Sequence, residues 1–147
     1  LRIGYLAAPE PVIEAIAHRV SLTDGMGNTI TEDTCADLIE SGEVRRHARK
    51  AWRAYAERRE HFAELLRREL AGHAEFTMPD GGLAFWVRFD GDLDAIESRA
   101  REAGLRFASH RSFMARDTAQ KGLRLGFASL DEDEAERAVA ALAKAAR

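Results

Sequence analysis

Two stretches of the sequence place an arginine two residues before a glycine within an apolar run. Residues 1–5 read Leu-Arg-Ile-Gly-Tyr, and residues 123–127 read Leu-Arg-Leu-Gly-Phe. In an extended strand, successive side chains alternate between faces, so Arg124 and Gly126 share one face and their apolar neighbours share the other. A guanidinium held beside a position without a side chain can bind a carboxylate or a phosphate bidentately. Arg2 with Gly4, and Arg124 with Gly126, are therefore candidate anion-binding residues that could hold the two ends of one ligand.

A second interpretation of the same pattern needs no ligand. Two buried strands whose arginines simply reach solvent at the edge of a sheet would produce the same five residues. The spacing alone leaves both interpretations open.

The composition describes a protein that can bury one good hydrophobic core. The chain has 147 residues, of which 46% are hydrophobic, and a formal net charge of −3, which does not favour a nucleic-acid or membrane surface. Cys35 is the only cysteine, so an internal disulfide and a metal site built on thiolates are excluded. No apolar run approaches the roughly 18 residues of a membrane span, and no signal-peptide pattern is present. We expect a soluble, cytoplasmic protein.

The elements that must position the two arginines follow from hydrophobic periodicity and turn residues. Helical spacing predicts helices over residues 11–22, 31–39, 43–70 and 92–103, and a last helix from Asp131 onward. Apolar runs predict strands over residues 1–8, 75–78, 82–89, 105–109 and 123–128, with an irregular loop over residues 110–120. The strand 82–89 is apolar on both faces and is predicted at the centre of the sheet. The order from residue 75 onward, β-β-α-β-β-α, predicts an α/β fold with helices on one face of a mixed sheet.

The predicted helix 43–70 carries a cluster of basic residues between Arg45 and Arg59 that could indicate nucleic-acid binding. Four glutamates follow the cluster closely, namely Glu57, Glu60, Glu64 and Glu69. Mixed signs along a long helix are typical of a solvated face with local ion pairs. We therefore interpret this face as solvated surface, on a helix that could also bridge two lobes.

The order and spacing of these features resemble the C-terminal half of a fold-type-I, pyridoxal-phosphate-dependent aminotransferase. The landmarks are the opening Leu-Arg-Ile-Gly-Tyr-Leu, Ser41-Gly42 leading through Arg46-His47 into the long helix, Pro79-Asp-Gly-Gly-Leu before the apolar strand, and Leu123-Arg-Leu-Gly-Phe-Ala. Within that group the sequence is most similar to the effector half of GntR-type transcription regulators of the MocR branch. The resemblance implies that residues 46–147 form the C-terminal small domain, including the bridging helix, and that residues 1–45 are a remnant of the large cofactor-binding domain.

The resemblance also implies roles for the candidate residues. In the family, an arginine on an Arg-x-Gly strand helps to bind the phosphate of pyridoxal 5'-phosphate, and Arg2 with Gly4 matches that position. A later strand arginine binds the α-carboxylate of the amino acid, and Arg124, with Gly126 beside it, matches that one. Gly82 matches a turn of small residues near the substrate.

One departure from the family pattern concerns the lysine that forms the Schiff base with the cofactor. That lysine would precede residue 1, and none of Lys50, Lys121 and Lys144 lies in the required context. We therefore expect the chain to be part of a longer parent protein and not to be catalytic by itself.

Three functions follow as alternatives. The resemblance favours the ligand-sensing effector domain of a GntR/MocR-type transcription regulator, which responds to an amino acid or amine and contacts DNA only through an N-terminal domain outside this chain. The second is a fragment of a free-standing class I/II aminotransferase that acts on amino acids and 2-oxo acids. The third is a structural α/β module without a ligand. The family habit implied by the resemblance is a homodimer.

Overall fold

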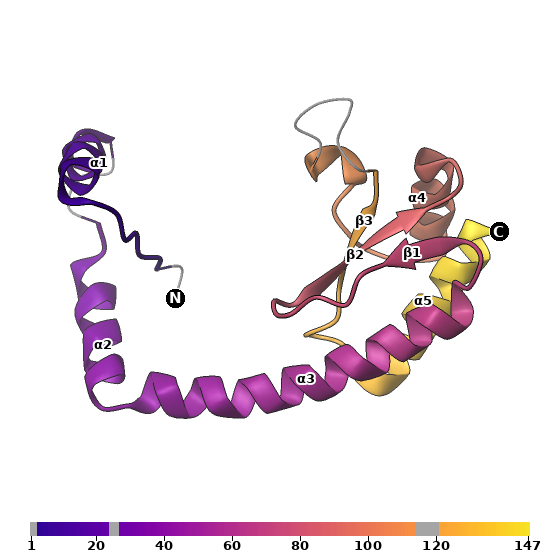
Figure 1. Ribbon diagram of the computed structural model, residues 1–147, viewed down its shortest axis with the longest axis horizontal. Helices are drawn as coiled ribbons and strands as arrows, with labels where there is room; N and C mark the ends of the chain where they lie inside the picture. The colour runs from indigo at the N-terminus through magenta and orange to yellow at the C-terminus, as the bar shows by residue number, and fades with distance from the viewer. Residues whose placement is uncertain (1–2, 24–26, 114–120) are drawn as a thin grey trace. The chain divides into compact units, whose positions relative to one another are not determined.

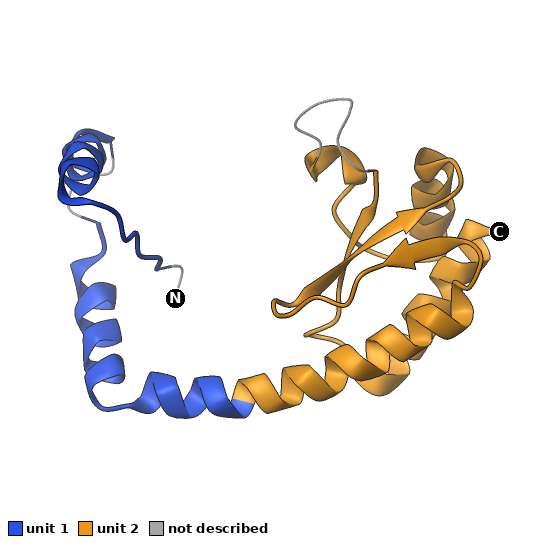
Figure 2. Cartoon of the chain, viewed as in Figure 1, with its two compact units in different colours: residues 1–50 blue, residues 51–147 orange. Residues whose placement is uncertain are grey.

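A division inside its longest helix separates the chain into two units (Figure 2). The computed structural model describes residues 3–23, 27–113 and 121–147 (Figure 1). The first unit is Leu1–Lys50 and the second is Ala51–Arg147. The helix that contains the division, α3, runs over Glu43–Glu69, close to the predicted range.

The first unit contains helices α1 (Glu10–Thr23) and α2 (Thr29–Glu40), neither of which has a buried residue. Helix α2 begins two residues earlier than predicted, because Asn28 is its N-cap. The Asn28 side chain accepts a hydrogen bond from the backbone N–H of Thr31 at 3.1 Å, which satisfies one of the free donors at the start of the helix.

The strand predicted over residues 1–8 is wrong for the residues that the structure describes. Residues 3–8 are exposed and do not belong to any strand. A strand is stable only when a neighbour accepts and donates its backbone hydrogen bonds, and no described segment pairs with this one. Its apolar pattern is typical of a strand, but none of the described residues pairs with it.

The second unit is built on an antiparallel sheet of the order β1-β2-β3. The strands are β1 (Ala74–Phe76), β2 (Ala84–Phe89) and β3 (Leu123–Gly126). The central position predicted for the apolar strand 82–89 is confirmed, since β2 pairs with both neighbours. The described strands are all antiparallel and not mixed, because the predicted strand 105–109 does not join them.

Helices α3, α4 (Leu93–Glu102) and α5 (Glu132–Ala146) lie on the same side of this sheet (Figure 1). Their apolar residues meet one face of the sheet in a core centred on Phe85, which is 1% exposed. The ring centroid of Phe85 lies 5.7 Å from that of Phe62 on α3 and 5.5 Å from that of Phe127. Each ring removes a large apolar area from water, so this cluster is the main stabilising feature of the second unit.

Acidic residues cap the two shorter core helices. The Asp92 side chain accepts from the backbone N–H of Asp94 at the start of α4, where the predicted helix 92–103 also begins. Asp131 and Glu134 form a reciprocal capping box at the start of α5. Both caps fix where a loop ends and a helix begins.

The predicted strand 105–109 is also wrong, and its backbone is bonded elsewhere. The Leu105 N–H donates to the Ala100 carbonyl at 3.0 Å, and the Arg101 guanidinium donates to the Phe107 carbonyl at 2.8 Å. Helix α4 therefore holds a segment that the apolar pattern assigned to the sheet. A short 3-10 helix, η1 (His110–Phe113), follows it. The remainder of the predicted loop, residues 114–120, lies outside the described residues.

The long helix α3 carries the ion pairs expected of a solvated face. Arg46 pairs with Glu43, Arg59 with Glu60 and Arg68 with Glu69. Within residues 3–23, 27–113 and 121–147, no helix combines the length and the apolar character needed to cross a membrane.

Gly122 allows β3 to approach β2, which generates a prediction for stability. A Cβ at this position would lie 2.7 Å from Nε1 of Trp86 and 2.8 Å from the carbonyl oxygen of Val87. We expect Gly122→Ala to lower the free energy of unfolding by about 1–3 kcal/mol, because ring and backbone must both move. Urea unfolding measures this change. Gly126→Ala is the matched control, since its Cβ would meet nothing closer than the Leu83 carbonyl at 3.8 Å. Equal effects of the two substitutions would contradict the steric explanation.

Candidate functional site

Strand β3 presents Arg124 to solvent because its neighbours are fixed in the core. Leu123 is fully buried and Leu125 is 8% exposed, whereas Arg124 and Gly126 are exposed. The alternation that the sequence predicted for this strand is therefore confirmed. Arg124 and Gly126 therefore lie on the face of β3 opposite to that of Leu123 and Leu125.

The register of the sheet defines what surrounds Arg124 on that face. Arg124 lies directly opposite Trp86, and Gly126 lies directly opposite Ala84. Directly opposed residues in an antiparallel pair share a face, so Arg124 has small residues around it and one indole ring beside it. The ring of Phe113 packs against that indole ring in a T-shaped arrangement, with the ring centroids 5.8 Å apart. Arg124 thus shares its face with an aromatic pair on one side and, on its own strand, with a glycine that has no side chain.

A cavity of about 400 Å³ lies beside β3 and includes Arg124 and Gly126 in its lining. Segment 104–108 forms one wall, and Leu125 and Leu142 contribute apolar surface. Arg106 and Arg124 are the only charged residues among the described residues that line it. A cavity lined by two arginines and by no acidic residue favours an anion over a cation.

No described acidic residue forms an ion pair with Arg124. Other arginines of the second unit are engaged, such as Arg88 with Glu75 at 3.0 Å and Arg111 with Asp94 at 2.7 Å. The charge of Arg124 is thus not neutralised by an acidic residue in the described part of the chain, and the N–H donors of its guanidinium are available for a ligand.

The turn that contains Gly82 lies against the far end of β3. Gly82 has a φ of 85°, a conformation that favours glycine. The Leu83 carbonyl, one residue later, accepts from the Phe127 N–H at 3.2 Å. The structure therefore brings Gly82, predicted as a site residue, to the end of the strand that carries Gly126.

Comparison with known proteins places this geometry in a family. The profile of the family described as aminotransferase class I and II matches residues 1–142. The chain belongs to this family. Two solved aminotransferases show the same fold. The LysN alpha-aminoadipate aminotransferase of Thermus thermophilus aligns over 95% of this chain and 36% of its own, with 25% identity and a TM-score of 0.78. The kynurenine aminotransferase of Pyrococcus horikoshii aligns over 93% of this chain and 34% of its own, with 22% identity and a TM-score of 0.84.

Curated relatives of this aminotransferase-family chain include regulators as well as enzymes. MocR of Rhizobium meliloti, a probable rhizopine catabolism regulatory protein, is 31% identical over 133 residues, which cover 89% of this chain and 27% of MocR. The 2-aminoadipate transaminase of Thermus thermophilus is 24% identical over 147 residues, which cover 99% of this chain and 37% of the transaminase. The chain thus spans well under half the length of either relative.

The first predicted arginine site of this family member is not part of the described geometry. Arg2 lies outside the described residues. Gly4 is exposed, and a Cβ at its position would meet nothing within 4 Å. The site that the structure describes is therefore the one around Arg124.

Two arginines that sequence reasoning assigned to solvated surface instead hold the loops beside the site. Arg59 on α3 donates to the carbonyls of Pro79 and Asp80, at 3.2 and 3.4 Å. Arg58 donates to the carbonyl of Ala128, just after β3. One signal could have found them. Both precede the buried Phe62 by three or four residues, so they flank the buried stripe of the helix.

Arg59 should contribute to stability through these backbone contacts. Its side chain is only 23% exposed, so we expect Arg59→Ala to lower the free energy of unfolding by about 1–2 kcal/mol, as the turn carbonyls lose a charged donor. Thermal and urea unfolding measure the loss. Arg53→Ala is the control, because Arg53 is an exposed residue of the same helix, and its effect should stay within about 0.5 kcal/mol. Indistinguishable variants would show that Arg59 is surface only.

Proposed function

We propose that Arg124 binds the α-carboxylate of an amino acid. The observation that carries this proposal is the cavity beside β3, whose described lining holds two arginines and no acid. Carboxylate and guanidinium groups match as bidentate partners. Gly126 and the turn at Gly82 would leave room for the ligand to lie close to the backbone, and Trp86 with Phe113 would limit the access of water from one side.

We propose pyridoxal 5'-phosphate as the cofactor of the complete protein. It supplies an electron sink for chemistry at the α-carbon of the amino acid. LysN was solved with N-(5'-phosphopyridoxyl)-L-leucine, which supports this choice. The described residues fit the carboxylate end of such a ligand and not the covalent anchor of the cofactor. Lys50, Lys121 and Lys144 are all exposed, whereas a lysine that forms a Schiff base is activated by desolvation or by a neighbouring cation. The role of this chain is to bind and orient the amino acid.

For the complete protein, we propose a transcription regulator of the GntR/MocR type in which this chain is part of the ligand-sensing domain. MocR and the HTH-type regulator YisV of Bacillus subtilis are 31% and 34% identical to the chain, above the 24% of the transaminase. In this proposal the protein is a homodimer, residues 1–45 belong to the large domain, and DNA is bound by a segment outside this chain. A free-standing aminotransferase is the second candidate, supported by the match to 2-aminoadipate transaminase over 99% of the chain.

Substitution of Arg124 tests the carboxylate role in the complete protein. Arg124→Ala should retain the absorbance band of bound pyridoxal phosphate, because Arg124 is proposed to contact the amino acid and not the cofactor. Titration with amino acids should show an affinity lower by about tenfold to a hundredfold, the effect of losing a charged bidentate hydrogen bond.

Arg88→Ala is the matched control for this experiment. Arg88 is an arginine of the adjacent strand β2 whose charge is already paired with Glu75, so amino-acid affinity should be unchanged. Equal affinity of wild type and Arg124→Ala would refute the carboxylate role. A wild-type protein that shows no cofactor band would overturn both the regulator and the aminotransferase proposals and favour the structural module.

A further inference from the structure

Glu97 and His110 are the two polar side chains buried among the described residues. Glu97 lies on α4, and His110 begins η1 thirteen residues later. Their side chains are 9% and 5% exposed. Buried ionisable groups are costly unless they are paired, so a pair kept at this position calls for an explanation.

One carboxylate oxygen of Glu97 accepts two hydrogen bonds from His110. It accepts from the backbone N–H of His110, and it lies 3.0 Å from Nδ1 of the imidazole ring. An ionised carboxylate has no proton to donate, so Nδ1 carries the proton. The pair is thus fixed in orientation at both its backbone and its ring.

The charges that surround this pair are of both signs. Nε2 of His110 lies 3.8 Å from Oδ1 of Asp94, the other acid of α4 that faces it. Arg111 donates to both carboxylate oxygens of Asp94, at 3.1 and 2.7 Å. Lys121 adds positive charge near Asp94. Burial by itself would raise the pKa of Glu97, but the hydrogen bonds from His110 and Ser109 outweigh it and hold that pKa below its ordinary value.

The segment that this pair holds forms part of the candidate site. Residues 104–108, which end two residues before His110, line the cavity beside Arg124. Phe113, at the end of η1, packs against Trp86, which lies opposite Arg124 in the sheet. The segment has no sheet pairing of its own, so its position depends on contacts with α4.

We propose that Glu97 and His110 act as a latch that holds residues 105–113 against α4 and thereby positions one wall of the cavity beside Arg124. Glu97 is a positioning residue in this proposal, since it does not line the cavity itself. The inference rests on the proposed function, because the wall matters only if an amino acid binds beside it. Acid weakens the latch, because the pKa of Glu97 is lower in the folded protein than its unfolded value near 4.5. The stabilisation that ionised Glu97 gives to the folded segment is complete above pH 4.5, and it is lost as the pH falls through the folded-state pKa.

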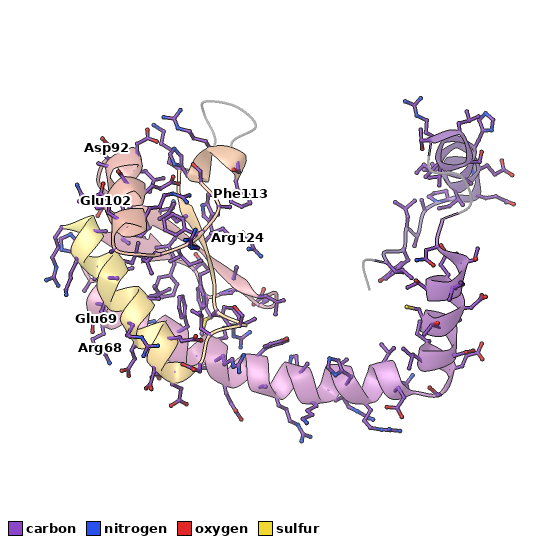
Figure 3. The ribbon with its side chains drawn as sticks, turned by 180° about the vertical axis from the view of Figure 1, so that it is seen from behind. Arg68, Glu69, Asp92, Glu102, Phe113 and Arg124 are labelled. Carbon is purple, nitrogen blue, oxygen red and sulfur yellow. The ribbon has the colours of Figure 1, made fainter. Side chains whose placement is uncertain are left out.

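The test compares three variants of α4 by amide hydrogen exchange in this chain and by amino-acid titration of the complete protein with pyridoxal phosphate. Glu97→Leu replaces the hydrogen-bond acceptor with an apolar side chain of similar volume. We expect it to speed exchange of the His110 amide about tenfold and to weaken amino-acid affinity about tenfold. Glu97→Gln retains an amide oxygen and should give a smaller loss, about threefold. It should also abolish the fall in exchange protection of residues 105–113 that acid causes in the wild type, once the intrinsic exchange rate at each pH is taken into account. Glu102→Gln, an exposed acid of the same helix (Figure 3), should change neither quantity.

Several results would overturn the latch. Unchanged exchange in Glu97→Leu would show that the pair does not hold the segment. Faster exchange with unchanged amino-acid affinity would show that the segment is held but does not position the site. A wild type that binds no amino acid would reject the proposed function and the positioning role together, whereas a wild type that binds one as tightly as Glu97→Leu does would reject the positioning role alone. Circular dichroism of each variant confirms that the fold is retained.

Discussion

Burial of Leu123, Leu125 and Phe127 against the core fixes the direction in which Arg124 points. The first two side chains lie on one face of β3, Phe127 follows directly after the strand, and all three are at most 8% exposed. A rotation of the strand would therefore expose large apolar groups to water, at a cost of about 1.5–3 kcal/mol each. Arg124 is therefore held by its apolar neighbours and not by bonds of its own. A binding group oriented in this way keeps its donors free for a ligand, and it is as rigid as the strand that carries it.

The loops around Arg124 are held by polar contacts from two helices. On one side, Arg58 and Arg59 of α3 bond to backbone carbonyls just after β3 and in the turn before β2. On the other side, Arg101 and Glu97 of α4 bond to the segment between residues 105 and 113. Strand burial thus determines where the guanidinium lies, while charged side chains determine the shape of the space in front of it. Loss of the strand burial would displace the guanidinium, whereas loss of the polar contacts would displace the loops around it.

Sequence reasoning predicted the elements of the second unit whose signals were local. The helix starts near Asp92 and Asp131, the turn before β2 and the alternation in β3 depend on residues a few positions apart. It failed for residues 3–8 and 105–109, where an apolar run resembles a strand but the outcome depends on whether a partner pairs with it. In residues 105–109, the Phe107 carbonyl accepts a hydrogen bond from the Arg101 guanidinium and not from a neighbouring strand. The Glu97–His110 pair was equally invisible, because two polar residues thirteen positions apart carry no local signal of burial.

A crystal structure of the complete protein with pyridoxal phosphate and an amino acid would test the central claim most directly. The claim is that the guanidinium of Arg124 binds the carboxylate of the amino acid. We expect two hydrogen bonds of about 2.7–2.9 Å between them, with Gly126 beside the ligand and the 104–108 wall in place. A carboxylate bound by other residues, with Arg124 directed to solvent, would refute this role of Arg124.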